Sequence, residues 1–289
     1  MVAPDFLQSP RVREWLNGIE PAWTLLEFDS FNALRREPSR DGSAIRLTAN
    51  ISDADLVASA VASNALRLLQ KAGHSGGLKL TASGNLSRAV VAEMRDALEW
   101  PGYNKDEEFR FHRVINEPDF LPLHFVRILC QGAGLMRRYR GSLRLTQVGK
   151  RVLTASGRGG LQAILFHVTF WLTNLASFDR VPLASWPQSD IGIVLWCLST
   201  SALGWETPER LMRLCTVPVI GVLEAKWDFP RSAFEVRVLR PLTWFGVLES
   251  RQDEPVDSEP TRPRYRKTPF FDQFVSFDVR LETHAGDRH

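Results

Sequence analysis

Residues 134–153 read Gly-Leu-Met-Arg-Arg-Tyr-Arg-Gly-Ser-Leu-Arg-Leu-Thr-Gln-Val-Gly-Lys-Arg-Val-Leu. The order predicts the end of one helix, a two-stranded hairpin and the start of a second helix. Alternating apolar residues around Leu143 and Leu145 predict a short strand with one buried face. Thr146 suits the N-cap of the next helix, because its hydroxyl can accept a hydrogen bond from a free backbone N–H.

Positive charge is concentrated around this hairpin. Residues 120–178 contain eight Arg or Lys residues and no Asp or Glu, although the whole chain of 289 residues has a net charge of only +3. The rest of the sequence therefore carries a net charge of −5. Such an asymmetry is typical of proteins that bind a polyanion.

The strand-to-helix part of this motif returns twice, once as a strand-to-helix entry and once within a second hairpin. Residues 78–84 share Leu-basic-Leu-Thr-x-x-Gly with residues 143–149, and we expect a strand there, again followed by a Thr suited to capping the next helix, at about 87–98. Residues 265–271 form a weaker copy, in which Pro269 occupies the favoured first helical position. Helices are predicted at 121–133 and 234–245, and each ends in Gly and an apolar residue just before a hairpin.

We therefore expect a mainly α fold with small β-hairpins (α+β class), built from tandem winged-helix-like modules joined by a buried helical block. Residues 1–51 form an N-terminal segment of unclear fold. Residues 52–157 form the first module with its basic wing, starting with a helix that Ser52 caps and that runs to Lys71. Residues 158–289 hold the helical block and the second module with a long wing loop.

The composition narrows the class of protein. At 44% hydrophobic and 24% charged residues, it is that of an ordinary globular protein. The most apolar stretch, 161–175, is too short to span a membrane, and no signal peptide is visible. Cys130, Cys197 and Cys215 show no metal-binding spacing. We expect a cytoplasmic protein with reduced core thiols and with no cofactor, metal site or membrane partner.

Known enzyme signatures are missing from the sequence. Gly149-Lys150-Arg151 lacks the spacing of a phosphate-binding loop, and no Gly-x-Ser-x-Gly elbow occurs. The acidic cluster at 106–108 is expected to be a solvated loop. We predict that the protein is not an enzyme; a catalytic site assembled only in three dimensions is the alternative.

A family resemblance follows from these motifs. Residues 143–153, preceded by Gly134-Leu135, resemble the wing of many bacterial winged-helix regulators. With Leu80-Thr81-x-x-Gly84-Asn85-Leu86 upstream and the apolar helices around Trp171 and Trp196-Cys197-Leu198 downstream, residues 52–278 resemble the helical region of plasmid-borne ORF-three-like proteins of bacteria. The N-terminal sheet domain often attached to such regions is not evident here. The resemblance implies a winged-helix-type fold and supplies no catalytic residues.

A DNA-binding surface is the leading functional hypothesis. His124, Arg127 and Gln131 share one face of the helix at 121–133, where Arg and Gln are suited to base edges in the major groove. Phosphates would be contacted from the wing and the next helix by Arg137, Arg138, Arg140, Arg144, Lys150 and Arg151. The alternative is a solvated helix face beside a basic hairpin.

The second hairpin mixes both charges. Its basic residues are Arg262, Arg264, Arg266 and Lys267, and its acidic residues are Asp253, Glu254, Asp257 and Glu259. DNA would repel these acids, so we expect this hairpin to serve packing or a partner instead.

The sequence therefore predicts a bacterial cytoplasmic protein that binds double-stranded DNA, as a regulator or a mobile-element accessory. The alternative is a protein–protein interaction scaffold without nucleic-acid binding, engaged with a protein partner or as a homodimer. Winged helices serve both roles, so the fold alone does not decide between them.

Overall fold

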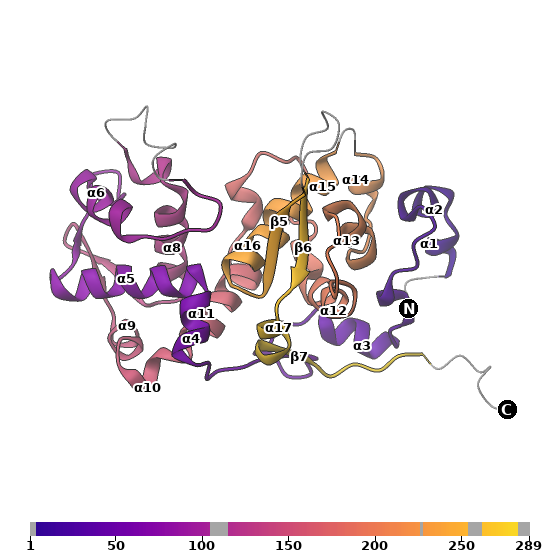
Figure 1. The fold of residues 1–289 in the computed structure, drawn as a ribbon, viewed down its shortest axis with the longest axis horizontal. Helices are drawn as coiled ribbons and strands as arrows, with labels where there is room; N and C mark the ends of the chain where they lie inside the picture. Colours follow the sequence, from indigo (N-terminus) through magenta and orange to yellow (C-terminus); the bar gives the residue numbers. More distant parts are fainter. Residues whose placement is uncertain (1–3, 105–114, 226–227, 254–261, 283–289) are drawn as a thin grey trace. The chain divides into compact units, whose positions relative to one another are not determined.

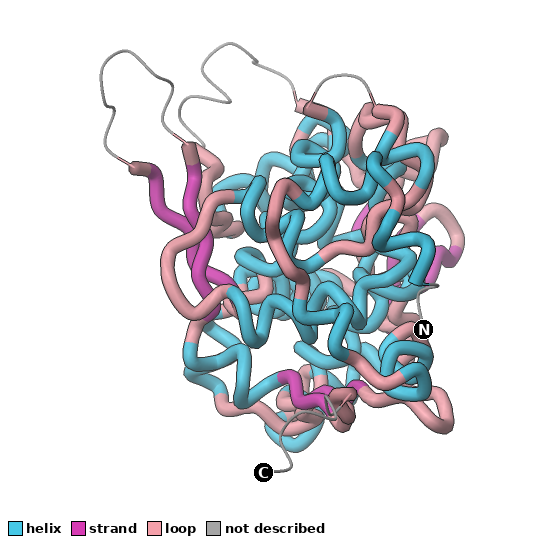
Figure 2. Tube along the Cα trace, turned by 90° about the vertical axis from the view of Figure 1, so that its right-hand side faces the viewer, coloured by secondary structure: helices cyan, strands magenta, loops and turns pink. Residues whose placement is uncertain are grey.

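The computed structural model describes residues 4–104, 115–225, 228–253 and 262–282, and it consists of helices with a few short strands (Figure 2). The predicted fold class, mainly α with small β-hairpins, is confirmed. The predicted acidic loop at 106–108 and part of the second wing loop lie outside the described residues. The chain divides into two compact units: unit 1 comprises residues 1–47, 174–243 and 247–289, and unit 2 comprises 48–173 and 244–246.

The described part of unit 2 contains one three-stranded antiparallel sheet. Its strands are β2 (Leu78–Lys79), β3 (Met136–Tyr139) and β4 (Ser142–Leu145), in the order β2-β4-β3. Its helices are α4 (Asp53–Ala58), α5 (Ala60–His74), α6 (Arg88–Ala97), η2 (Glu117–Asp119), α8 (Leu121–Gly132), α9 (Gln147–Val152), α10 (Ala155–Arg158), α11 (Leu161–His167) and the π-helical η3 (Val168–Leu172). Figure 1 shows α6 and α8 above the long α5 and shows α9 and α10 below it.

Thr146 fixes the end of the hairpin. Its backbone N–H donates to the Leu135 carbonyl at 3.0 Å, and its hydroxyl oxygen accepts from the Gly149 N–H at 3.1 Å, which confirms the predicted N-cap. Thr81 in the first copy behaves differently. Its hydroxyl oxygen accepts from the Asn85 N–H within a tight turn, and α6 begins only after Ser87, so the expected capping role of Thr81 is wrong.

The helix predicted from Ser52 to Lys71 is divided in two. Ser52 caps α4 as expected, accepting from the Asp55 N–H at 3.2 Å. Ser59 then adopts an extended backbone, and its hydroxyl oxygen accepts from the Ala62 N–H at 3.2 Å. A serine can thus end one helix and cap the next, because its short side chain competes for backbone groups.

Unit 1 includes both ends of the chain. Its described strands form two small antiparallel sheets, β1 (Ile45–Leu47) with β7 (Val275–Phe277) and β5 (Leu248–Gln252) with β6 (Pro263–Lys267). The sequence predicted no clear fold for residues 1–51, and residues 1–47 of this segment belong to a unit in which β1 pairs with β7. Its helices are α1 (Pro4–Gln8), α2 (Pro10–Leu16), η1 (Ala22–Leu25), α3 (Phe28–Leu34), η4 (Leu175–Phe178), η5 (Gln188–Asp190), α12 (Ile191–Ser201), α13 (Pro208–Cys215), α14 (Ile220–Leu223), α15 (Phe229–Phe234), the π-helical η6 (Glu235–Leu239), α16 (Arg240–Trp244, whose last residue is assigned to unit 2) and α17 (Pro269–Phe274).

The two units repeat one order of elements. In unit 2 the order is α5, β2, α6, α8, β3 and β4; in unit 1 it is α12, an extended residue Glu206, α13, the helical run α15–α16, β5 and β6. Glu206 bridges Tyr265 of β6, as β2 pairs with β4. The hydrogen bonds also correspond, since the Thr268 N–H donates to the Val247 carbonyl at 3.0 Å. Both predicted hairpins are therefore present, with the same closure.

One buried arginine organises the middle of unit 1. Arg237 on η6 is 1% exposed. Its guanidinium donates to both carboxylate oxygens of Asp179, at 2.7 and 2.9 Å. It also donates to the backbone carbonyls of Val181, Leu183, Ala184 and Trp186. A buried charge is tolerated when it is paired and its donors are satisfied. Arg237 can therefore hold the segment 179–186 against η6.

Packing of α12 against α3 requires a glycine. A Cβ added to Gly192 would lie 1.9 Å from the Leu34 carbonyl oxygen, whereas a Cβ at Gly221 would meet nothing within 4 Å. We expect Gly192→Ala to lower the free energy of unfolding by about 1–3 kcal/mol or more. The control Gly221→Ala, in a helix, should leave it unchanged or raise it by up to about 1 kcal/mol. Urea unfolding of both variants measures this, and equal stability would contradict the packing of α12 on α3.

Candidate nucleic-acid interface

The outer face of the unit 2 sheet carries basic side chains. The register places Arg137 directly opposite Arg144 and Lys79 opposite Ser142. Side chains alternate along a strand, so Lys79, Arg137, Tyr139 and Arg144 lie on one face, and these four residues define the basic sheet face. Leu78, Met136 and Leu143 are buried on the other side of the sheet.

Most charges of the acid-free run have no carboxylate partner in the described part of the chain. Of its eight basic residues, Arg127 pairs with Glu117, and Arg158 lies 3.7 Å from Asp53. Among the described residues, no carboxylate lies within ion-pair distance of the other six, Arg137, Arg138, Arg140, Arg144, Lys150 and Arg151. These six are the basic residues that the sequence assigned to phosphate contacts, and all of them are exposed. Unbalanced charge of this kind favours an anionic partner.

Tyr139 lies at the centre of the hairpin cations. The guanidinium carbons of Arg144, Arg140 and Arg137 lie 4.9, 5.2 and 5.7 Å from its ring centroid. These distances fall within the range of cation–π attraction. Arg138 points away from this group, toward the turn before α6, where a Cβ on Gly84 would lie 2.7 Å from its Nη1.

A buried carboxylate holds the helix predicted to read bases. Glu117 is fully buried. It accepts hydrogen bonds from the Leu86 N–H, from His124 at 2.9 Å and from the Arg127 guanidinium, which also donates to Gln131. His124, Arg127 and Gln131 thus share a face, as predicted, but Arg127 is 6% exposed and belongs to an internal network.

The surroundings of α8 limit what it offers to a ligand. The helix buries Pro122, Leu123, Phe125, Val126, Arg127, Leu129 and Cys130. His124 and Gln131 are half-buried, so a contact of these residues with base edges stays a prediction. The alternative interpretation of this helix was a solvated polar face. Arg127 does not fit it, because its charge is neutralised by Glu117 inside the unit.

Lys79 is a member of the basic face that the sequence-based selection missed. It lies in β2, beside β4, on the same side of the sheet as Arg144. A usable signal was present, because Lys79 and Arg144 occupy the same position in the two Leu-basic-Leu-Thr copies. The missing information was that these copies pair with each other in one sheet.

The hairpin of unit 1 provides an internal comparison. Each of its five described basic residues is paired with a carboxylate: Arg251 and Arg264 with Asp253, Arg262 with Glu209, Arg266 with Glu249 and Lys267 with Asp272. The Trp205 ring lies beside two of these arginines, 4.6 Å from the guanidinium carbon of Arg251 and 4.5 Å from that of Arg266. The same hairpin topology therefore carries a balanced surface here.

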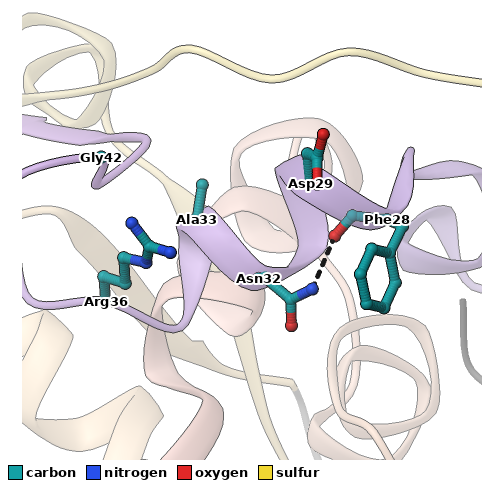
Figure 3. A pocket seen from close by; sticks show the side chains of 6 residues that line it. All are labelled: Phe28, Asp29, Asn32, Ala33, Arg36 and Gly42. Atoms are coloured by element: carbon teal, nitrogen blue, oxygen red, sulfur yellow. Dashed lines mark hydrogen bonds between the residues drawn. The ribbon is translucent and has the colours of Figure 1, made fainter.

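Other kinds of site find little support in the described part of the chain. Figure 3 shows a pocket of unit 1 lined by Phe28, Asp29, Asn32, Ala33, Arg36 and Gly42. Asn32 and Arg36 donate to backbone carbonyls, at 3.0 and 3.2 Å, and Asp29 and Asn32 point in opposite directions. These groups do not converge as an acid and a base acting on one substrate would, so the pocket supports no catalytic proposal.

The described residues contain no group of three or more His, Cys, Asp or Glu side chains placed to hold a metal ion. Within the same residues, no helix is long and apolar enough to cross a membrane. The cysteines Cys130, Cys197 and Cys215 are free and buried. Burial raises the pKa of the Cys130 thiol to about 12, so this group stays protonated at neutral pH.

Comparison with known proteins shows a similarity to one family within unit 2. Residues 57–158 match the model of the Y4jL N-terminal domain family. Over 78 residues the chain is 37% identical to a protein of Sinorhizobium fredii (strain NBRC 101917 / NGR234) described as uncharacterized protein y4jL. The aligned part is 27% of this chain and 36% of that protein. No solved structure matches the chain.

The matched range falls within unit 2 and includes α5 to α10, with the whole sheet and Glu117. The chain spans only about a third of the length of its S. fredii relative. The similarity therefore relates this segment to a family and supplies no activity for it.

Acid is expected to weaken unit 2 through Glu117. Burial alone raises the pKa of this carboxyl, but the hydrogen bonds from His124 and Leu86 and the charge of Arg127 outweigh burial and hold the pKa below its ordinary value of 4.5. A carboxyl whose pKa is lower in the folded state stabilises the fold above its ordinary pKa, and this contribution is lost as pH falls through the folded value. The free energy of unfolding should therefore drop as the pH falls below 4.5.

Glu117→Gln isolates this contribution. The variant leaves Arg127 buried without a counter-charge, so we expect it to lose about 3–5 kcal/mol of stability at neutral pH and to show a flatter acid dependence. The control Glu93→Gln removes an exposed carboxyl that pairs with Lys71, and it should change stability by less than about 1 kcal/mol. Denaturant unfolding across the acid range measures both. An acid profile for Glu117→Gln as steep as that of the unaltered protein would contradict this role.

Proposed function

We propose that unit 2 is a winged-helix domain that binds double-stranded DNA through its basic hairpin. The observation that carries the proposal is the set of six exposed cations without a carboxylate partner among the described residues. Arginine and lysine are suited to phosphate oxygens, and neutralising phosphates releases counterions, which drives binding.

The element order supports the winged-helix assignment. A helix, a strand, two helices and a hairpin, with the first strand beside the last, occur in unit 2 as α5, β2, α6, α8, β3 and β4. In such a domain the hairpin is the wing. The proposed wing therefore carries four of the six cations that have no carboxylate partner among the described residues, and α9 carries the other two.

The hairpin of unit 1 supports a specific role for this charge. Both hairpins have the same closing hydrogen bond, between a Thr N–H and the carbonyl of the residue after Gly. Only the hairpin of unit 2 leaves its arginines unpaired among the described residues, while Arg264 and Arg266 in unit 1 are neutralised. The topology does not require free charge, so the charge on the unit 2 hairpin is better explained by a partner.

The proposed contacts are to phosphates rather than to bases. Phosphate contacts position a protein on a duplex without reading its sequence. Arg127, the strongest candidate for a base contact, is committed to Glu117. We therefore expect similar affinities for duplexes of different sequence. A role as a regulator or mobile-element accessory, and a location in the bacterial cytoplasm, remain predictions that go with this proposal.

Replacing Arg137, Arg138 and Arg140 together by Gln tests the proposal. Each lost phosphate contact weakens binding, so the affinity for a labelled random-sequence duplex should fall by about tenfold or more at moderate salt. Fluorescence anisotropy measures this affinity, and circular dichroism checks that the variant is folded.

A matched control removes three charges from unit 1. Arg210, Arg251 and Arg262 are exposed, and each pairs with a carboxylate. Replacing these three by Gln changes the net charge equally, so it separates a local site from a general charge effect. Equal losses in both triple variants, or no loss in the hairpin variant, would contradict the assignment.

A protein-interaction scaffold is the second candidate. The observation that favours it is the balanced surface of the unit 1 hairpin, where the Trp205 ring lies beside Arg251 and Arg266. Aromatic and arginine side chains are enriched in protein interfaces. Sedimentation of the purified chain over a range of concentrations would reveal a homodimer, and failure of duplex binding would make this candidate the leading one.

A further inference from the structure

The arginines of the unit 2 hairpin are held together against their own repulsion. Arg137 and Arg144 face each other across the strands, and like charges in that position destabilise a hairpin. Both guanidinium groups, with that of Arg140, lie within 6 Å of the Tyr139 ring, at 5.7, 4.9 and 5.2 Å for Arg137, Arg144 and Arg140. The ring is 39% exposed, and its negative faces attract cations. One aromatic side chain therefore gathers three charges at the surface.

The turn of the hairpin is not optimised for stability. Arg140 has φ +45° and Gly141 has φ +71°, so both residues of the two-residue turn adopt the left-handed region. Asn or Gly at the first of these positions would relieve strain, because residues such as arginine rarely adopt this conformation. Arginine at this position lowers the stability of the turn, and its guanidinium carbon lies 5.2 Å from the centroid of the Tyr139 ring. Strained residues of this kind cluster at functional sites.

We infer that Tyr139 is a positioning residue for DNA binding, which gathers Arg137, Arg140 and Arg144 into one arrangement for successive phosphates of a nucleic-acid strand. Flexible arginines lose rotamer freedom when they bind, and holding them in advance reduces this loss. Planar guanidinium groups can then donate two hydrogen bonds to each phosphate. The inference rests on the proposed function and specifies how its site is built.

Tyr139→Leu and Tyr139→Phe test the inference. Leucine removes the aromatic ring and keeps every charge, so the three arginines must be ordered when they bind, and affinity for a labelled random-sequence duplex should fall about fivefold to tenfold. Phenylalanine keeps the ring and should retain most of the affinity. The control Val57→Ser alters another exposed apolar side chain of unit 2, on α4, and should bind like the unaltered protein.

Arg140→Asn provides a second readout that a purely structural role would not give. This variant should raise the thermal midpoint by about 2 °C or more, because Asn favours the left-handed turn, while it weakens duplex binding. A variant that gains stability and loses binding cannot owe the loss to misfolding.

The outcomes separate the inference from the function beneath it. If the unaltered protein binds no duplex, the proposed function fails, and the inference fails with it. If the unaltered protein binds and Tyr139→Leu binds equally well, the inference alone is overturned. Weaker binding by Tyr139→Leu, rescued by Tyr139→Phe, supports the inference.

Discussion

The arrangement of unit 2 depends on the buried carboxylate of Glu117. This group joins the backbone just before α6, at Leu86, to two side chains of α8, His124 and Arg127. A buried charge without such partners would be strongly unfavourable, so the carboxylate and its donors require one another. The network also removes the charge of Arg127 from the surface. The exposed positive charges of the acid-free run lie on the hairpin and on α9.

The second organising feature is the repetition of one topology with two electrostatic outcomes. Each hairpin is closed by a Thr N–H that donates to the carbonyl of the residue after a left-handed Gly, which is Gly134 in one hairpin and Gly246 in the other. In unit 1 the resulting surface is neutralised by Glu209, Asp253 and Glu249. In unit 2 three of the hairpin arginines lie around an aromatic ring, Tyr139, and none of them pairs with a carboxylate among the described residues. This difference is the basis of the proposal that unit 2 binds an anionic partner.

Local signals in the sequence predict much of this fold. Gly134, Thr146 and Pro269 act within a few residues, and the hairpins and helix starts that they predict are present. Long-range pairings could not be predicted in this way, because nothing local links β1 to β7 or Glu206 to β6. Ser59 divides a helix that hydrophobic periodicity alone makes continuous.

The candidate site was predictable in its charge and not in its pairing. The density of arginine around residues 137–144 is visible in the sequence, whereas the fate of Arg127 depends on Glu117, ten positions away and outside the acid-free run. In unit 1, the partner of Arg262 is likewise distant in sequence, because Glu209 lies on α13 and not in the hairpin. Which cations lack a carboxylate partner is a property of tertiary structure.

Measuring the affinity of the unaltered protein for a labelled duplex across a salt series tests the central claim most directly. We predict that log affinity falls linearly with log salt, with a slope of about −0.9 per phosphate contact and a total magnitude of at least about 3 if the four hairpin arginines engage. No binding at low salt, or affinity independent of salt, would contradict the account.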